Sequence, residues 1–306
     1  MELLDLRYFV SIAETGSFTK AALKNNIAQS ALSRRIRELE SDLGVTLFYR
    51  NGRGVVPTEA GETLLARGRV VLADVESLRQ ELGQQRGVLG GTVTLGVPPS
   101  VGLALLAPLL ARIRAEHPGI RMRVLEGFSG HVAEWMVNGR VDLAVLYKTR
   151  TSTLLDAEHL LFEDMYLISA ANAPAGAAET VPLPALADLE LVLPGQPHGL
   201  RLLVDEAAAQ TGVPLNVAME LETLPTICDL VATGTIRTVL PLTAVQARLK
   251  DGALVAQKIV GPVISRELIL AHAPQRAAAP ATRAVVRHIR AQIEALVRAG
   301  DWVGRI

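Results

Sequence analysis

Residues 18–40 read Phe18-Thr-Lys-Ala-Ala-Leu-Lys-Asn-Asn-Ile-Ala-Gln-Ser-Ala-Leu-Ser-Arg-Arg-Ile-Arg-Glu-Leu-Glu40, two helical patterns separated by a short polar break. In the second pattern Leu32, Ile36, Leu39 and Leu43 recur at the spacing of one helix face, which predicts that this face packs inward. The polar and basic residues of this pattern are then expected to face outward: Gln29, Ser30, Ser33, Arg34 and Arg37. Because Arg can fork onto guanine and Gln onto adenine, the pattern predicts a helix that enters a DNA major groove.

The next segment predicts a hairpin with a basic tip. Apolar residues before and after Asn51-Gly52 indicate two short strands, and this dipeptide favours the tight turn between them. Arg50 and Arg53 are then expected at the tip, where they can contact phosphate or the minor groove. A basic helix followed by such a hairpin is typical of a winged helix-turn-helix. The alternative is an ordinary solvated surface, because helix pairs occur in many folds.

A long helix is predicted after the hairpin. Thr58 resembles its N-cap, and acidic residues follow in the first turn. The spacing then alternates by four and three residues, as in a coiled coil, at Leu64, Gly68, Val71, Val75, Leu78 and Leu82. This spacing favours a linker helix that dimerises, and the alternative is a helix packed along its own domain. The glycine-rich residues 86–91 end the helix.

From residue 92 onward, strand and helix patterns alternate. Strands are expected at residues 92–97, 121–125, 141–146, 190–193, 217–220, 238–240, 254–259 and 266–272. Helices are expected at residues 102–116, 132–138, 200–210, 224–233, 242–250 and 281–299. Such alternation predicts parallel sheets covered by helices, either in two lobes or in a single doubly wound sheet.

Composition and charge narrow the class of protein. Of 306 residues 49% are hydrophobic, enough for two or three domains, and no apolar run reaches the length of a membrane span. The N-terminus does not read as a secretory signal, and the single cysteine, Cys228, fits a reducing cytoplasm. Net charge is zero, and residues 1–57 hold eight basic and six acidic side chains, 8 − 6 = +2. Dimerisation and base contacts, rather than bulk attraction, are therefore expected to supply affinity for DNA.

Catalytic and metal-binding patterns are not found in the sequence. It contains no Gly-x-Ser-x-Gly, no phosphate loop and no His-Glu-x-x-His, and its six histidines are scattered without metal-ligand spacing. We therefore expect neither an enzyme nor a bound cofactor or metal. Cys228 lies in an apolar helical pattern and is expected to be inert packing.

The N-terminal motifs resemble the signature of LysR-type transcriptional regulators, in the same order and spacing over about the first 65 residues. They are Leu6-Arg-Tyr-Phe-Val10, Gly16-Ser-Phe-Thr-Lys-Ala-Ala22, Gln29-Ser-Ala-Leu-Ser-Arg-Arg-Ile36, Leu39-Glu-Ser-Asp-Leu-Gly-Val-Thr-Leu-Phe-Tyr-Arg50 and Thr58-Glu-Ala-Gly61. Residues 53–58, 129–130 and 142–147 look most similar to the nitrogen-assimilation-control-like members. Two residues depart from the family pattern: Ser30 replaces a common Pro, and Ala28 replaces a Ser that would cap the helix. Ser30 could cap one residue later and shift the helix start.

The resemblance implies the organisation of the whole chain. Residues 1–58 would form the winged helix-turn-helix, 59–89 the linker and dimerisation helix, and 90–306 a periplasmic-binding-protein-like effector domain. Lobe I would comprise about 90–163 and 266–306, and lobe II about 164–265, joined by two crossover strands. The implied partners are double-stranded operator DNA, a small-molecule effector that we expect to be anionic, RNA polymerase, and further copies in a homodimer or homotetramer. The competing hypothesis is a cytoplasmic small-molecule-binding protein whose N-terminal helices mediate protein contacts.

Candidate effector-binding residues follow the predicted strands. Ligands of α/β folds bind beyond the carboxyl ends of strands, where helix N-termini present free N–H groups to anions. The candidates in this chain are Pro99, Ser100, Val101, Phe128, Ser129, Tyr147, His198, Gly199 and Thr223. Ser100 is the leading candidate for holding a carboxylate. In the alternative interpretation, Ser100, Ser129 and Thr223 simply cap helices, Tyr147 packs in a lobe wall and His198 is an exposed turn residue.

Overall fold

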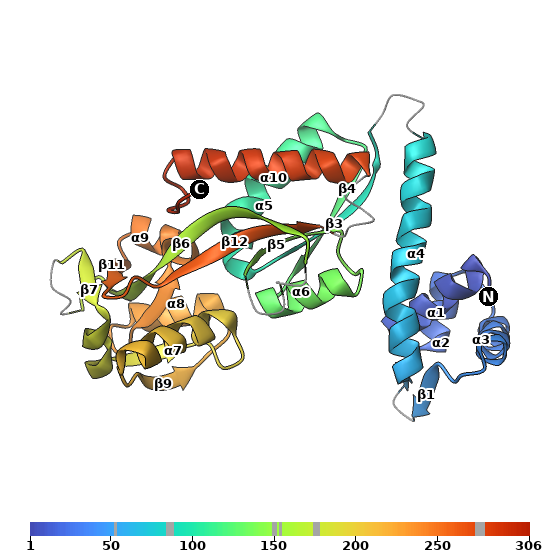
Figure 1. The fold of residues 1–306 in the computed structure, drawn as a ribbon, viewed down its shortest axis with the longest axis horizontal. Coiled ribbons are helices and arrows are strands. Elements are labelled where there is room, and N and C mark those ends of the chain that lie inside the picture. The colour runs from blue at the N-terminus through green and yellow to red at the C-terminus, as the bar shows by residue number, and fades with distance from the viewer. Residues whose placement is uncertain (52–53, 84–88, 149–151, 153–154, 174–177, 273–278) are drawn as a thin grey trace.

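The structure is a computed structural model that describes residues 1–51, 54–83, 89–148, 152, 155–173, 178–272 and 279–306. A helical head at the N-terminus is followed by one long helix and then by an α/β domain of two lobes (Figure 1). This architecture confirms the predicted fold class. Among the described residues, we find no helix with the length and apolar character that a membrane crossing requires.

The head consists of three helices and a two-stranded hairpin. Its elements are α1 (Leu3–Thr15), α2 (Phe18–Lys24), α3 (Gln29–Leu43), β1 (Phe48–Asn51) and β2 (Gly54–Pro57). Leu32 and Ile36 of α3 are fully buried in one cluster with Phe9, whose ring lies 4.9 Å from that of Phe48. The predicted inward face of α3 is confirmed for Leu32, Ile36 and Leu39. It is wrong for Leu43, the last residue of the helix, which is 38% exposed. The helix ends at Gly44, which takes the left-handed conformation (φ +69°) that favours glycine.

The hairpin predicted from the sequence is confirmed, because β1 and β2 pair antiparallel from Phe48 with Pro57 to Asn51 with Gly54. Gly52 lies outside the described residues, so the tight turn expected at Asn51-Gly52 stays a prediction. Arg53 lies outside the described residues, as does the side chain of Arg50.

Helix α4 (Glu59–Gly83) starts where Thr58 caps it. The Thr58 hydroxyl accepts a hydrogen bond from the Gly61 N–H (3.0 Å), as predicted, and donates one to the Thr46 carbonyl (2.7 Å). Gly68 lies against Leu6 of α1, because a Cβ at Gly68 would come within 2.7 Å of Leu6 Cδ1. Gly68 is thus a packing position inside the subunit and not a position on a dimer seam, which corrects the sequence interpretation.

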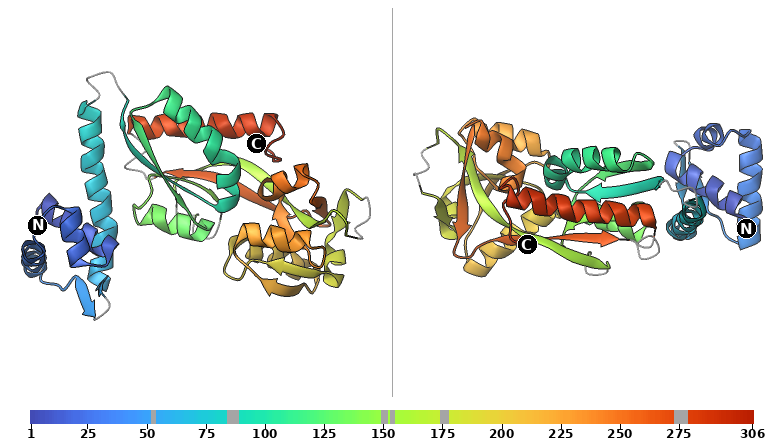
Figure 2. Two further views of the ribbon diagram at one scale, coloured as in Figure 1. Left: turned by 180° about the vertical axis from the view of Figure 1, so that it is seen from behind. Right: turned by 90° about the horizontal axis from the view of Figure 1, so that it is seen from above.

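Lobe I is a sheet with helices on both faces (Figures 1 and 2). Its parallel part contains β3 (Gly91–Val97), β4 (Ile120–Glu126) and β5 (Leu143–Tyr147), in the order β4-β3-β5. Helices α5 (Pro99–Glu116) and α10 (Pro280–Arg298) pack on one face, and α6 (Ser129–Val137) packs on the other. Each face of the sheet has its own hydrophobic core, and alternate residues of β5 contribute to the two cores. Leu143 and Val145 face α5 and α10, while Ala144 and Leu146 face α6.

Lobe II surrounds a second core of buried apolar side chains. Its elements are β7 (Thr180–Pro182), the 3-10 helix η3 (Leu183–Asp188), β8 (Glu190–Leu193), α7 (Gly199–Thr211), β9 (Asn216–Glu220), α8 (Leu224–Ala232), β10 (Thr238–Pro241), α9 (Leu242–Lys250) and β11 (Leu254–Val260). The sequence patterns predicted these elements except β7 and η3, which are too short to show a period.

Two strands pass between the lobes, β6 (Ala157–Ala170) and β12 (Ser265–His272) (Figures 1 and 2). β12 pairs with β5 and β6, and the far half of β6 pairs with β10 and β11. All these pairings are antiparallel, so the prediction of parallel sheets holds for β3-β4, β3-β5, β8-β9 and β7-β11 and is wrong for the crossover region. The difference arises because β6 and β12 cross between the lobes in opposite directions.

Candidate nucleic-acid interface and interlobe site

Helix α3 presents a polar, basic face to solvent. The four exposed candidates on it are Gln29, Ser30, Arg34 and Arg37. The Arg34 side chain is 74% exposed, and its nearest acidic partner, Glu38, is one turn along the same helix at 3.4 Å. A surface pair of this kind is weak, so the Arg34 guanidinium can exchange it for a base edge at little cost.

Ser33 does not share this orientation. It is only 9% exposed, and its hydroxyl accepts a hydrogen bond from the Gln29 side chain at 2.9 Å. The expectation that Ser33 faces outward is therefore wrong. Its position lies at the border of the apolar face, and Gln29, one turn earlier, covers its short side chain.

The start of α3 lacks a side-chain cap. Ala28 is the N-cap residue and makes no capping hydrogen bond, in line with the departure from the family pattern at this position. The helix nevertheless begins at Gln29, so the expectation that Ser30 shifts its start is wrong. Burial of Leu32, Ile36 and Leu39 holds the helix in place without the cap, which is typically worth about 1 kcal/mol.

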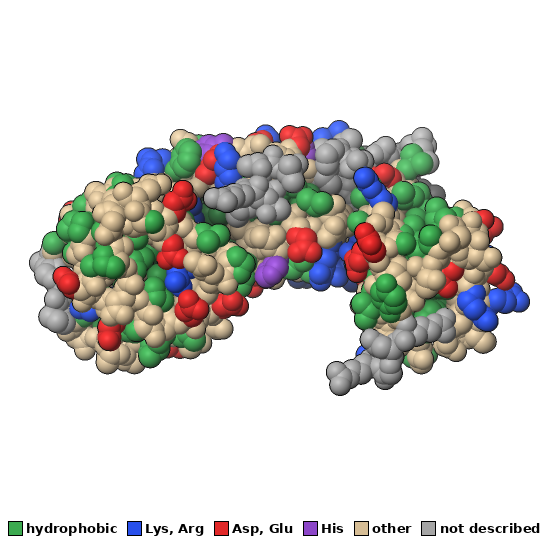
Figure 3. Space-filling view, turned by 60° about the horizontal axis from the view of Figure 1, so that its bottom comes forward, with side chains coloured by type: hydrophobic (Ala, Val, Ile, Leu, Met, Phe, Trp, Pro, Cys, Tyr) green, Lys and Arg blue, Asp and Glu red, His purple; other side chains and the backbone are tan. Residues whose placement is uncertain are grey.

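The charges on the surface are mixed. On the face shown in Figure 3, Lys and Arg side chains are interspersed with Asp and Glu and do not form a single field. Together with a net charge of zero, this distribution gives little bulk attraction for DNA. Charge alone therefore does not identify a DNA-binding surface on this face.

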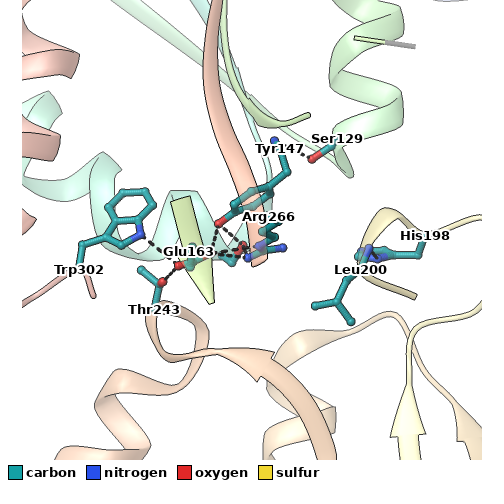
Figure 4. A network of polar contacts seen from close by, with 9 residues as sticks. Ser129, Tyr147, Glu163, His198, Leu200, Thr243, Arg266 and Trp302 are labelled. Atoms are coloured by element: carbon teal, nitrogen blue, oxygen red, sulfur yellow. Dashed lines mark hydrogen bonds and ion pairs between the residues drawn. The ribbon is translucent and has the colours of Figure 1, made fainter. Parts of the chain in front are cut away.

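A buried ion pair lies at the junction of the two lobes (Figure 4). Glu163 of β6 is fully buried, and Arg266 of β12 donates to its Oε2 from Nε (3.0 Å) and from a terminal nitrogen (2.8 Å). Trp302 Nε1 donates to Glu163 Oε1 at 3.0 Å, and the Thr243 hydroxyl donates to the same oxygen. Glu163 therefore connects both crossover strands with the start of α9 and the C-terminal tail.

Lobe I contributes Ser100 and Tyr147 to the same group. The Tyr147 hydroxyl donates to Glu163 Oε2 (2.9 Å) and lies 3.4 Å from the Ser100 hydroxyl. The Arg266 guanidinium lies over the Tyr147 ring, 3.3 Å from its centroid, in a cation–π contact. Burial raises the pKa of the Tyr147 phenol, so it stays a neutral donor. We refer to Ser100, Tyr147, Glu163, Thr243, Arg266 and Trp302 as the interlobe cluster.

Two helix N-termini flank this cluster. Gly102 N–H bonds to the Pro98 carbonyl, so the N–H groups of Ser100 and Val101 come before the first intrahelical bond of α5. Ser129 begins α6, and its hydroxyl accepts from the Tyr147 N–H at 3.2 Å. Free amides at helix N-termini favour anions, and Arg266 adds a positive charge beside Ser100 at 3.4 Å. The Glu163 carboxylate offsets part of that charge.

His198 lies near the cluster from the lobe II side. Its Nδ1 accepts from the Leu200 N–H (3.1 Å) and so caps α7, and its ring lies 4.5 Å from that of Phe128 in lobe I. Burial, and secondarily the charge of Arg266, lowers the pKa of His198 to about 4. Neutral His198 then keeps its proton on Nε2 as a hydrogen-bond donor. The contact with Phe128 bridges the two lobes.

The other candidates are placed differently. The Val101 side chain is fully buried in the lobe I core, so Val101 can offer a ligand only its backbone. Pro99 and Gly199 are the first residues of α5 and α7. Thr223 is exposed at the start of α8 and makes no capping bond, and no contact found among the described residues joins it to the interlobe cluster. The structure thus brings Ser100, Ser129, Tyr147, Phe128 and His198 together and leaves Thr223 apart.

Sequence reasoning missed Glu163 and Arg266, the two charged residues at the centre of the cluster. Both lie within strands that are otherwise rich in apolar residues, and a charge inside such a strand is the one signal that could have drawn attention to them. Their pairing depends on the crossover register, in which Arg266 lies opposite Glu163.

Cys228 is buried in the lobe II core, as expected for inert packing. Burial raises the pKa of its thiol. Because the thiolate is the nucleophilic form, this cysteine is poorly reactive.

A winged helix-turn-helix head joined to a two-lobed α/β domain with a polar cluster between the lobes defines a ligand-responsive DNA-binding regulator. Comparison with known proteins agrees with this class. Residues 3–62 match the bacterial regulatory helix-turn-helix proteins of the lysR family, and residues 86–294 match the LysR substrate binding domain. The chain therefore belongs to the LysR family of transcription regulators, which bind DNA and are controlled by small-molecule effectors.

Individual relatives support the assignment. The nitrogen assimilation regulatory protein nac of Escherichia coli (strain K12) is 33% identical over 90% of each chain, and that of Klebsiella aerogenes is 31% identical over 93% of each. A full-length OxyR variant from Pseudomonas aeruginosa has a TM-score of 0.77 at 25% identity, covering 96% of this chain and 95% of that one. CbnR complexed with its target DNA shares the fold, with a TM-score of 0.66 at 21% identity over 95% of this chain and 100% of that one. The family resemblance predicted from the sequence is confirmed.

Proposed function

We propose that this regulator works in the cytoplasm as a homodimer or homotetramer and reads an operator with α3. Gln29, Ser30 and Arg34 contact base edges, Arg37 lies beside them, and Arg50 and Arg53 on the wing contact the backbone or minor groove. The observation that carries this proposal is the exposed face of α3, on which Arg34 is 74% exposed. On this proposal the DNA-binding domain spans residues 1–58, the linker helix 59–89 and the effector domain 90–306.

Exposed apolar residues on α4 support self-association. Val71 and Leu78 are 46% and 55% exposed, although α4 packs its first turns on α1. Their spacing is that of a coiled-coil seam, and covering them with a second α4 would remove apolar surface from water. A dimer also places two α3 helices on successive half-sites, which compensates for the low net charge.

The effector in this proposal is a small anion held between the lobes. Support comes from the amides of Ser100 and Val101, the Ser100 hydroxyl and the adjacent Arg266 guanidinium. Its binding changes the angle between the lobes and, through α4, the spacing of the DNA-binding heads and their contact with RNA polymerase. An effector can drive this change only if its affinity differs between the two arrangements.

The DNA-binding role is tested by Arg34→Ala in a gel-retardation assay with the DNA upstream of the protein's own gene. We expect the variant to lose about 1–3 kcal/mol of binding free energy while its thermal unfolding is unchanged. Arg298→Ala is the matched control, because Arg298 is 77% exposed and also pairs with a Glu one turn away, in α10. Equal affinity of Arg34→Ala and wild type would rule out the proposed base contact.

The effector site is tested by Ser100→Phe. A panel of small carboxylates is first screened for those that raise the unfolding temperature of the wild type. We expect Ser100→Phe to abolish these shifts, because the ring fills the space in front of the Ser100 and Val101 amides, while DNA binding without a carboxylate is retained. Shifts of the same size in the variant would show that the carboxylates bind elsewhere.

A further inference from the structure

A second group of ligating side chains lies away from α3 and from the interlobe cluster. Glu116 and His117 end α5 and begin the turn after it, and His288 lies in the middle of α10. One ligand atom from each of these three residues lies within 4.8 Å of the other two. Helices α5 and α10 pack side by side on the same face of the lobe I sheet (Figure 1).

The geometry of this group is close to that of a metal site. His288 Nε2 lies 3.6 Å from Glu116 Oε2, and the rings of His117 and His288 have centroids 5.1 Å apart. In tetrahedral coordination, bonds of about 2.0–2.1 Å place neighbouring ligand atoms roughly 3.3–3.4 Å apart. Glu116 is exposed and His117 is half-buried, so small side-chain rotations can bring all three onto one ion.

A neighbouring cation already contacts one of these ligands. The Arg112 guanidinium donates to Glu116 Oε1 (2.7 Å), while His288 faces Oε2 of the same carboxylate. Arg112 therefore competes with a bound metal ion for Glu116.

We propose that Glu116, His117 and His288 form a binding site for a divalent transition-metal ion of the zinc type. Two imidazoles and one carboxylate are a ligand set that zinc accepts, with a water molecule in the fourth position. Sequence spacing could not reveal the site, because His288 lies far along the chain from the adjacent pair Glu116-His117. The simpler interpretation is a Glu116–His288 ion pair beside a surface Arg112–Glu116 pair, with no affinity for metal.

The position of the site gives it a structural consequence. His117 begins the turn that leads to Gly119, whose carbonyl accepts a hydrogen bond from the Gly91 N–H at 3.1 Å. Gly91 is the first residue of β3, where the chain enters lobe I after α4. A bound metal ion would link the C-terminal end of α5 to α10, close to the first residue of β3. We therefore expect it to stabilise lobe I, since a ligand that binds only the folded state raises the unfolding temperature.

The test uses the full-length chain without an affinity tag and Zn²⁺ as the probe. Isothermal titration calorimetry with Zn²⁺ should show one site per chain, and Zn²⁺ should raise the unfolding temperature. Glu116→Gln and His117→Ala are the test variants, because neither side chain is buried in the core and both proteins should fold. Removal of either ligand should weaken Zn²⁺ binding by more than about tenfold.

Two further variants complete the experiment. His159→Ala removes a histidine that contacts Glu267 and lies outside the group, so it should leave Zn²⁺ binding unchanged. Arg112→Gln removes the competing guanidinium and should tighten Zn²⁺ binding several-fold. The proposal is overturned if the wild type shows no one-site binding, or if Glu116→Gln and His117→Ala bind Zn²⁺ as the wild type does.

Discussion

At the residue scale, the junction of the lobes depends on how one buried carboxylate is neutralised. The Glu163 side chain is fully buried, and a buried carboxylate without hydrogen-bond or charge partners would be strongly destabilising. Arg266 supplies the opposite charge, and Tyr147, Thr243 and Trp302 fill the remaining acceptor positions. Because these partners come from both lobes and from the tail, the cluster holds one relative arrangement of the lobes. A ligand that contacts Arg266 or Ser100 would change this balance.

His198 gives the junction a dependence on pH. Its pKa of about 4 in the folded protein lies below its ordinary value of 6.5, so between these values the unfolded state binds more protons. The stability contributed by neutral His198 is therefore complete above about pH 6.5 and is lost as the pH falls towards 4. We predict that the unfolding free energy declines over this range with a His198 component of up to about 1.4 kcal/mol per pH unit.

Urea unfolding at pH 7, 6 and 5 measures this component. His198→Asn keeps an acceptor for the Leu200 N–H and cannot titrate, so its unfolding free energy should fall less steeply than that of the wild type. Replacement of the exposed His131 in the same way should leave the slope unchanged. Equal slopes for His198→Asn and wild type would contradict the assignment of this pH dependence to His198.

At the element scale, Thr58 links the hairpin to the long helix. Its hydroxyl caps α4 through Gly61 and bonds to the Thr46 carbonyl ahead of the hairpin. We predict that Thr58→Ala lowers the unfolding free energy by about 1–2 kcal/mol, since the cap of α4 is lost and the Thr46 carbonyl loses its donor. Thr63→Ala is the control, because the exposed Thr63 hydroxyl donates to the Glu59 carbonyl of its own helix. Chemical denaturation should give a larger loss of unfolding free energy for Thr58→Ala than for Thr63→Ala. Equal losses in the two variants would show that the cap of α4 does not supply this stability.

Periodicity predicted the elements well and their contacts less well. The inward face of α3 could be predicted from its apolar positions, and the start of α4 could be predicted from Thr58, because both signals are local in the sequence. Ser33 and Gly68 were misplaced, because their surroundings are set by Gln29 and Leu6 and not by the spacing of their own helix. A period shows which face of a helix is apolar, but it does not show what lies against that face.

The same limit explains the missed part of the candidate site. Ser100, Ser129 and Tyr147 could be predicted, because ligand positions after strands follow from a general property of α/β folds. Glu163 and Arg266 could be noticed only as charges within apolar strands, and their pairing could not be predicted, because it is fixed only when β6 and β12 align between the lobes. Long-range register of this kind leaves no trace in one sequence.

At the scale of the whole molecule, the crossover strands and the C-terminal tail join the lobes. Phe162 of β6 exchanges two backbone hydrogen bonds with Arg305, and Trp302 reaches Glu163. Asp164 of β6 forms ion pairs with Arg305 of the C-terminal tail and with Lys258 of β11 in lobe II. The tail, β6 and lobe II therefore meet at Asp164. On the proposed function, a change at the interlobe cluster alters these contacts between the lobes and reaches the head through α4 (Figure 1).

On the proposed function, α3 reads base edges in the major groove from each head of a dimer. Methylation interference on the operator tests it most directly, because methylation of guanine N7 blocks that edge in the major groove. We predict that methylated guanines in two half-sites, one helical turn or a multiple of it apart, prevent binding by the full-length protein. Binding that tolerates N7 methylation throughout the protected region would contradict the claim.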